Sequence, residues 1–267
     1  MAESKSNTVA ADSEFFLGRK IFFIHPNDML HNGLVMPVLR EEYQVYEIDT
    51  EEDVLSAVKQ FPDAVLFFCL ANAKPEFSFT SHAKLIDKLY QMSDPHTLRI
   101  GIICDTDSTS LRRSALYNTG INGVFAPLSK GYETVLKNII KYLKLIGAKS
   151  VRKYVRAVCD EEDNAFVTLH VADNAFTGSI MDVSSVSFSA KFDNDPNLST
   201  NTQISDTVLN IRGVDVAIPC HLFGVHKIDG SNGIFKQYVM LFDNNVAVDK
   251  SPIYDYIYYC LRRDLKL

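Results

Sequence analysis

The segment Ala64–Leu70 reads AVLFFCL and contains no charged side chain. A continuous apolar run of this kind is typical of a strand that is covered on both faces of a parallel sheet. Four similar runs lie on either side of it: Lys20–His25 (KIFFIH), Tyr43–Ile48 (YQVYEI), Arg99–Cys104 (RIGIIC) and Asn122–Ala126 (NGVFA). Helices are expected between and after these runs, at Asp28–Arg40, Thr50–Phe61, Ser81–Met92, Ser108–Asn118 and Tyr132–Ile146. Five strands that each precede a helix predict a doubly wound α/β domain.

Two helix ends carry residues that suit them. Thr50 stands before three acids in TEEDVLSAVKQF, which is typical of an N-cap and a first turn, and Pro62 follows where that helix should end. Gly147 follows the last helix, and glycine often takes the left-handed conformation just past a helix end. The α/β domain is therefore expected to end close to Gly147.

After Lys149 helical periodicity gives way to short strand-like segments. They are Phe166–Val171, Phe176–Val183, Ser185–Phe192, Thr207–Ile211, Val214–Ile228 and Phe235–Phe242, with turn residues at 173–174, 193–196 and 229–233. Six short strands in about 80 residues predict a small antiparallel β-barrel. Pro252–Leu265 has apolar residues four apart and predicts a C-terminal amphipathic helix. The expected organisation is a flexible tail at residues 1–18, the α/β domain at 19–149 and the β-barrel domain at 150–267.

The composition excludes several classes of protein. Of the 267 residues, 46% are hydrophobic and 22% are charged, which excludes a mostly disordered or collagen-like chain. The net charge of −6 argues against a surface that holds nucleic acid non-specifically, and no apolar run is long enough to cross a membrane. Five scattered cysteines without a CxxC pair argue against a disulfide framework or a zinc site. We expect a cytoplasmic protein without membrane insertion or a nucleic-acid partner.

The order of elements and the phrase Gly120–Pro127 (GINGVFAP) resemble a two-component receiver domain over residues 19–147. Receivers carry a phosphate-accepting aspartate at the end of the third strand, an acidic pair for magnesium after the first strand, and a lysine before the proline of the last strand. Here the third strand ends in FCLA at Phe68–Ala71, Asp28 is the single acid after the first strand, and Ala126 precedes Pro127. Phosphoryl transfer needs the acceptor, the metal and the lysine together. The resemblance therefore implies a receiver-like scaffold or docking domain, and an active phospho-acceptor regulator is disfavoured.

Two motifs mark the second domain. Arg152 and Arg156 form an Arg-x-x-x-Arg segment within VRKYVR, and Asp182 and Ser184 form an Asp-x-Ser segment within DVSSVS. The two motifs at this separation, followed by barrel strands, resemble the PilZ domain, a family that binds the bacterial second messenger cyclic di-GMP. The resemblance covers roughly residues 150–267. The family motif ends in glycine where this chain has Ser187, which either narrows the approach of the ligand or adds a hydroxyl contact.

The residue types fit the chemistry that the resemblance implies. Arginine offers a planar fork of donors for phosphate or for the O6 and N7 edge of guanine. By resemblance, Arg152 and Arg156 clasp cyclic di-GMP from a flexible segment, while Asp182 accepts from guanine N1 and N2 and Ser184 donates to phosphate from the barrel face.

The combined interpretation is a non-enzymatic signalling receptor that senses cyclic di-GMP, changes its domain arrangement on binding and acts on a downstream protein that the sequence does not identify. It needs no cofactor beyond that ligand and no metal. The alternative is an interaction adaptor whose degenerate barrel binds no nucleotide.

Other candidates are weaker. His221 and His226 lie five apart within one predicted strand, so they are expected on opposite faces, where they could not share a metal. The acidic run 160–163 (DEED) is expected to be a solvated loop. A second, less favoured hypothesis is that it forms ion pairs with Arg152 or Arg156 when ligand is absent.

Overall fold

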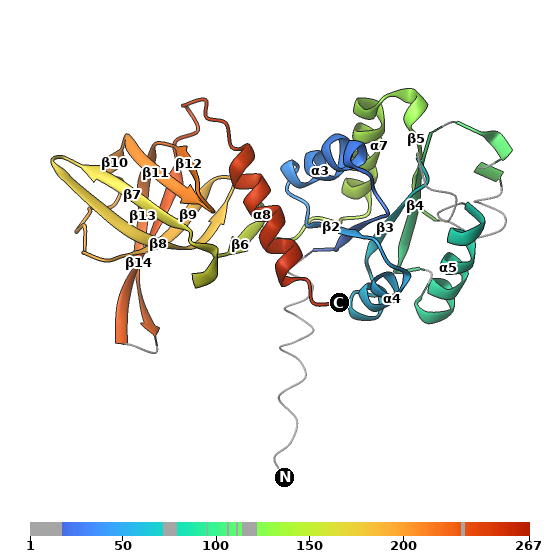
Figure 1. Ribbon diagram of the computed structural model, residues 1–267, viewed down its shortest axis with the longest axis horizontal. Coiled ribbons are helices and arrows are strands. Elements are labelled where there is room, and N and C mark those ends of the chain that lie inside the picture. The colour runs from blue at the N-terminus through green and yellow to red at the C-terminus, as the bar shows by residue number, and fades with distance from the viewer. Residues whose placement is uncertain are drawn as a thin grey trace, which may run out of the picture. The chain divides into compact units, whose positions relative to one another are not determined.

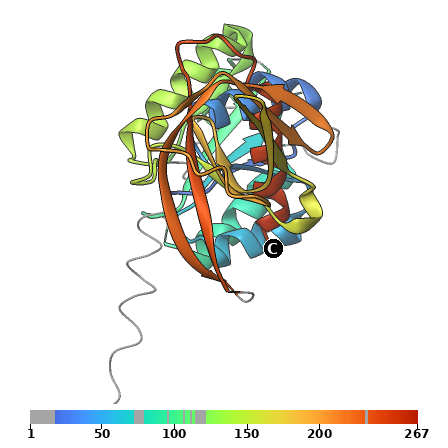
Figure 2. The ribbon, with the colours of Figure 1, turned by 90° about the vertical axis from the view of Figure 1, so that its left-hand side faces the viewer.

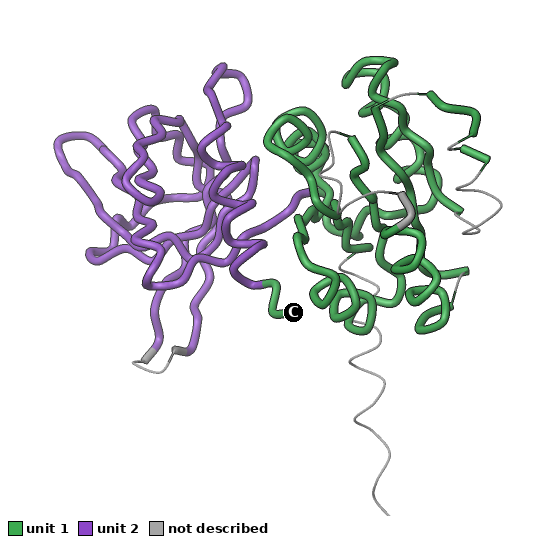
Figure 3. The backbone as a smooth tube through the Cα atoms, turned by 45° about the vertical axis from the view of Figure 1, so that its right-hand side comes forward, with its two compact units in different colours: residues 1–153, 265–267 green, residues 154–264 purple. Residues whose placement is uncertain are grey.

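The computed structural model describes residues 18–71, 79–94, 96–105, 107–110, 112–113, 122–230 and 233–267. The chain separates into two compact units (Figure 3). Unit 1 consists of Met1–Lys153 with Leu265–Leu267, and unit 2 of Tyr154–Asp264. None of the described helices is long and apolar enough to cross a membrane.

Unit 1 is built on a five-stranded parallel sheet. Its strands are β1 (Ile21–Ile24), β2 (Val45–Ile48), β3 (Val65–Cys69), β4 (Arg99–Cys104) and β5 (Phe125–Pro127). Their order is β2-β1-β3-β4-β5, which is the order of flavodoxin-like doubly wound domains. Every residue of β1 and β3 is buried, as expected for strands covered by helices on both faces (Figure 1).

The helices of unit 1 largely follow the expected pattern. They are α2 (Asp28–Leu30), a π-helical turn (His31–Val35), α3 (Met36–Arg40), α4 (Glu51–Gln60), α5 (Phe79–Met92), a 3₁₀ turn (Leu128–Lys130) and α7 (Tyr132–Leu145). The first three form one continuous helical segment over the predicted 28–40. The helix predicted at 108–118 lies for the most part outside the described residues, so the full (βα)5 repeat is not confirmed.

The two predicted helix ends are confirmed. The Thr50 side chain accepts a hydrogen bond from the Asp53 amide at 3.1 Å and so caps α4. After α7, Gly147 has φ +63, and the Ala148 amide donates to the Leu143 carbonyl at 2.9 Å. This pattern is the left-handed helix end that glycine favours.

Unit 2 is an antiparallel sheet with one helix. Its strands are β6 (Arg156–Val158), β7 (Phe166–Val171), β8 (Asn174–Ser184), β9 (Ser187–Phe192), β10 (Gln203–Ile204), β11 (Asp206–Ile211), β12 (Val214–Ala217), β13 (Cys220–Gly230) and β14 (Gly233–Phe242). The order is β10-β13-β14-β9-β8-β7-β11-β12, and β6 pairs with β8 beyond the end of β7. The strands curve around a core that includes Phe188 and Phe242, with ring centroids 5.8 Å apart (Figure 1, Figure 2).

The six-strand barrel is not confirmed, because the described residues of unit 2 form nine strands. The predicted strand Val214–Ile228 is two strands, β12 and β13, and Pro219 lies between them without an N–H to donate to a ladder. β6 and β10 have only three and two residues, too few for an alternating pattern. The predicted C-terminal helix is α8 (Ser251–Asp264), and it buries Ile253, Ile257 and Leu261.

Candidate functional site

Arg156, from the first sequence motif, lies on a strand beside the second motif. β6 runs antiparallel to the end of β8, so that Arg156 lies opposite Ser184 and Val158 lies opposite Asp182. Residues two apart on a strand share a face, so Arg156 lies on the same face as Asp182. The Nε atom of Arg156 is 3.4 Å from Oδ1 of Asp182. The Arg156 side chain is 47% exposed and that of Asp182 is 15% exposed, so the pair is open to solvent on one side.

Two residues that the sequence interpretation missed extend this pair across the sheet. Ser189 on β9 lies opposite Asp182 and donates its hydroxyl hydrogen to Oδ2 of Asp182. Gln237 on β14 donates from Nε2 to Oγ of Ser189 at 2.9 Å. A bulge in β8 between Ile180 and Asp182 precedes the carboxylate, and bulges commonly re-aim a side chain. We name the four residues Arg156, Asp182, Ser189 and Gln237 the polar row.

Arg152 belongs to a different compact unit from the four residues of the polar row. It belongs to the last residues of unit 1, whereas Arg156 belongs to unit 2. Its backbone carbonyl accepts from the Ser150 hydroxyl at 2.8 Å, and its side chain is exposed. Among the described residues its guanidinium has no ion pair, so its charge is available to an anion.

Ser184 and Ser187 form the turn between β8 and β9. Their hydroxyl oxygens are 2.9 Å apart, and the Ser187 amide donates to Oγ of Ser184 at 3.2 Å. Ser184 is 2% exposed and Ser187 is 8% exposed. The structure therefore places the two serines together at the end of β8 and the start of β9, and their hydroxyls bond within the turn. Ser187 is absent from the residues with positive φ, so its backbone does not require glycine.

The acidic run 160–163 does not pair with either motif arginine, which corrects that hypothesis. Asp163 is buried and accepts hydrogen bonds from Arg263, from the Tyr256 hydroxyl at 3.0 Å and from the Asp160 amide at 2.8 Å. Burial alone would raise the pKa of Asp163, but these hydrogen bonds and the charge of Arg263 together hold the pKa below its usual value. Asp163 is thus a structural anchor for α8, while the other three acids of the run are exposed, as expected of a solvated loop.

The two histidines of β13 correct a second expectation. A bulge between Leu222 and Gly224 shifts the alternation of the strand, so His221 and His226 fall on one face rather than on opposite faces. Their partners on β14 lie four residues apart, which is about 13 Å along a strand. That separation prevents a shared metal. The described residues contain no group of three His, Cys, Asp or Glu side chains that could hold a metal ion.

A histidine follows the first strand of unit 1, where receivers carry acids, and it contacts a second histidine on α5. His25 follows β1 with φ +53, and its Nδ1 is 3.2 Å from Nε2 of the buried His82. Burial lowers the pKa of His25. β3 ends at the buried Cys69, and burial raises the pKa of that thiol. Within the described strand end no carboxylate stands where the family's phosphate acceptor stands.

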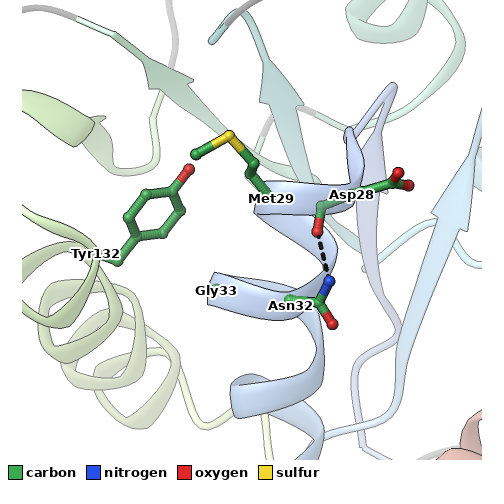
Figure 4. Close-up of a pocket in the computed structure, with 5 residues that line it drawn as sticks. All are labelled: Asp28, Met29, Asn32, Gly33 and Tyr132. Carbon is green, nitrogen blue, oxygen red and sulfur yellow. Dashed lines mark hydrogen bonds between the residues drawn. The ribbon is translucent and has the colours of Figure 1, made fainter.

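A pocket of about 450 Å³ lies between the start of the first helical segment and α7 in unit 1 (Figure 4). Met29 and Tyr132 face each other across it, and Asp28, Asn32 and Gly33 complete the lining. A Cβ atom on Gly33 would lie 2.4 Å from the Tyr132 ring, so glycine is what allows this close approach. The Asp28 carboxylate points away from Tyr132, which leaves the pocket mostly apolar.

No family model matches the sequence, and no curated protein matches it either. Among solved structures, the chain is similar to the PilZ domain of YcgR from Escherichia coli with c-di-GMP. The TM-score is 0.36 at 14% identity, over 43% of this chain and 94% of that chain. It is also similar to the K. pneumonia MrkH–c-di-GMP complex, with a TM-score of 0.35 at 15% identity, over 43% of this chain and 52% of that chain.

A third similar structure is a CheY-like response regulator receiver domain from Methanospirillum hungatei. Its TM-score is 0.33 at 12% identity, over 48% of this chain and 98% of that chain. The chain thus spans about half the length of the MrkH protein, but nearly all of the isolated domains. The two families that the sequence resembles are the families of these structural neighbours, at a likeness too distant to carry a function over.

Proposed function

We propose that unit 2 binds cyclic di-GMP on the face of its sheet that carries the polar row, and that the chain is a receptor for this second messenger. The observation that carries the proposal is the Arg156–Asp182 pair, which brings the two separated motifs to 3.4 Å on adjacent strands. A second exposed arginine, Arg152, lies four residues before the pair.

The chemistry of these groups suits an anionic purine nucleotide. Guanidinium groups form bidentate, charge-assisted hydrogen bonds with phosphate oxygens. A carboxylate only accepts hydrogen bonds, so Asp182 suits the N1 and N2 donors of guanine. Acidic side chains outnumber basic ones in residues 150–267, so a local arginine pair is the natural place for a phosphate in this part of the chain.

One observation favours the adaptor that binds no nucleotide. The Ser184 and Ser187 hydroxyls bond each other instead of facing solvent, so neither supplies the phosphate contact that the motif implies. In that function unit 2 would serve as a protein-docking domain, and the arginines would be ordinary surface charges.

Isothermal titration calorimetry with cyclic di-GMP separates the two functions. We expect saturable binding by the wild-type chain and a loss of at least tenfold for Arg152→Ala and for Arg156→Ala, because a hydrogen bond to a charged group is worth about 1.5–3 kcal/mol. Lys153→Ala is the matched control, since it removes a neighbouring positive charge outside the motif. No binding by the wild-type chain would favour the adaptor, whereas unchanged affinity in the double arginine variant would overturn the assignment of the site.

A further inference from the structure

The hydrogen bonds of the polar row all run in one direction, from Gln237 to Ser189 and from Ser189 to Asp182. Asp182 is an acceptor, so the single hydrogen of the Ser189 hydroxyl is committed to Oδ2 of Asp182. Ser189 can therefore only accept from Gln237, which turns the Nε2 side of the amide toward Ser189 at 2.9 Å. Ser189 is 2% exposed, so water does not compete for this arrangement. The orientation of the Gln237 amide follows from the carboxylate two strands away.

This direction leaves a defined pattern of groups on the surface. Asp182 and Gln237 are each one hydrogen bond from the same Ser189 oxygen, so the carboxylate and the amide are close neighbours. Each carboxylate oxygen has a second lone pair, and the half-buried Gln237 keeps one N–H and its Oε1 without a partner among the described residues. The row thus presents acceptors at Asp182 beside a donor at Gln237.

We propose that Gln237 is a base-reading residue of the cyclic di-GMP site and that Ser189 positions it. This inference rests on the proposed function. The Watson–Crick edge of guanine presents two donors, N2 and N1, followed by the acceptor O6. Asp182 takes the two donors, and the Gln237 N–H donates to O6. Adenine presents an acceptor at N1 and a donor at N6, so it opposes both groups of the row.

The test compares cyclic di-GMP and cyclic di-AMP by calorimetry on the same protein samples. For the wild-type chain we expect clear preference for cyclic di-GMP. Gln237→Glu replaces the donor by an acceptor that repels O6 and accepts from adenine N6, so the preference should fall about tenfold or more. Gln237→Leu removes the donor without adding charge, and it should lower the affinity for cyclic di-GMP while leaving that for cyclic di-AMP unchanged.

Two controls keep the result specific. Gln203→Glu makes the same charge change on the exposed edge strand β10, and it should leave the preference intact. The double Arg152→Ala and Arg156→Ala variant should weaken both nucleotides alike, because phosphate is common to them. The preference is a ratio within one sample, so partial unfolding of a variant cannot imitate its loss.

The outcomes distinguish this inference from the proposed function. If the wild-type chain binds neither nucleotide, the proposed function is wrong, and so is the base-reading role of Gln237. If the wild-type chain binds, the arginine variant loses both nucleotides, and both Gln237 variants keep the preference, then the receptor function stands and the base-reading role is wrong.

Discussion

At the scale of single residues, the serines of the β8–β9 turn use their hydroxyls in hydrogen bonds that hold the turn. The Ser184 hydroxyl accepts from the Ser187 amide and contacts the Ser187 hydroxyl. Both are buried, and a buried hydroxyl without a partner costs free energy. The turn that carries Asp182 to its place beside Arg156 is therefore held by the motif's own side chains.

Ser187→Gly tests this role. We expect the variant to lose about 1–2 kcal/mol of unfolding free energy, from one buried hydrogen bond and from the greater freedom of glycine in the unfolded chain. Ser187→Ala removes only the hydroxyl and should lose about half as much. Urea unfolding followed by circular dichroism measures both. The family's glycine also leads us to expect tighter cyclic di-GMP binding by Ser187→Gly, and weaker binding would show that the hydroxyl contacts the ligand.

Arg263→Gln should make the stability of unit 2 depend differently on pH. The pKa of Asp163 is lowered in the folded chain, so this carboxylate stabilises the fold above its unfolded pKa of about 3.9, and the contribution fades as pH falls through the folded value. Without Arg263 the buried carboxylate loses its counter-charge but keeps the hydrogen bonds from Tyr256 and the Asp160 amide, and we expect a deficit of about 1.5–3 kcal/mol at neutral pH.

The same deficit should shrink near pH 3, where protonation of Asp163 removes the buried charge. Denaturant unfolding at the two pH values measures it, and Arg262→Gln is the matched control on the exposed side of α8. A deficit that stays constant with pH would mean that the loss of packing, rather than the charge of Asp163, explains the effect.

The sequence predicted the candidate site only in part. Arg156, Asp182 and Ser184 were identified from their motifs, but their approach depends on β6, which is too short to leave a periodic signal. Ser189 and Gln237 were missed because their strands were interpreted only as structure. A signal was present, since polar serines alternate with apolar residues in SVSFSAKF at 185–192. Only the strand register shows that this polar face meets Asp182.

At the scale of elements, prediction worked where the apolar pattern of a strand has sharp ends and failed where the backbone is interrupted. β4 and β7 match their predicted ends at Arg99–Cys104 and Phe166–Val171, because their apolar patterns begin and stop sharply. The bulges in β8 and β13 leave no mark in hydrophobic periodicity. One extra residue in β13 was enough to reverse the predicted placement of His221 and His226.

The end of β3 yields a prediction about phosphorylation. β3 ends at the buried Cys69, so the place of the receiver phosphate acceptor has a thiol instead of a carboxylate. We expect that acetyl phosphate with magnesium leaves the intact mass of the chain unchanged, while a receiver domain that carries the aspartate gains a phosphoryl group in the same reaction. A phosphorylated species that survives mutation of Asp28 and Asp105 would reveal an acceptor elsewhere.

At the scale of the whole molecule, the motif arginines flank the point where the chain passes from unit 1 to unit 2, between Lys153 and Tyr154. A ligand held by both arginines would further restrain the residues between them, at a cost of up to about 1–2 kcal/mol per residue that binding must offset. We therefore expect cyclic di-GMP to protect residues 147–157 from hydrogen exchange and to change the small-angle scattering profile. If cyclic di-GMP binds without either change, the binding site stands but a change of domain arrangement on binding is wrong.

The anchoring of α8 also bears on how the chain folds as it is synthesised. Arg263 donates to the Val158 carbonyl across 105 residues, and Tyr256 reaches Asp163 across 93. Contacts of such long range can form only after α8 has left the ribosome, whereas all five strands of the unit 1 sheet are complete by Pro127. Domains generally fold in order of synthesis. Unit 1 can therefore fold before Arg263, which pairs with Asp160 and Asp163, has been synthesised. Unit 2 therefore cannot complete its fold until α8 has been synthesised.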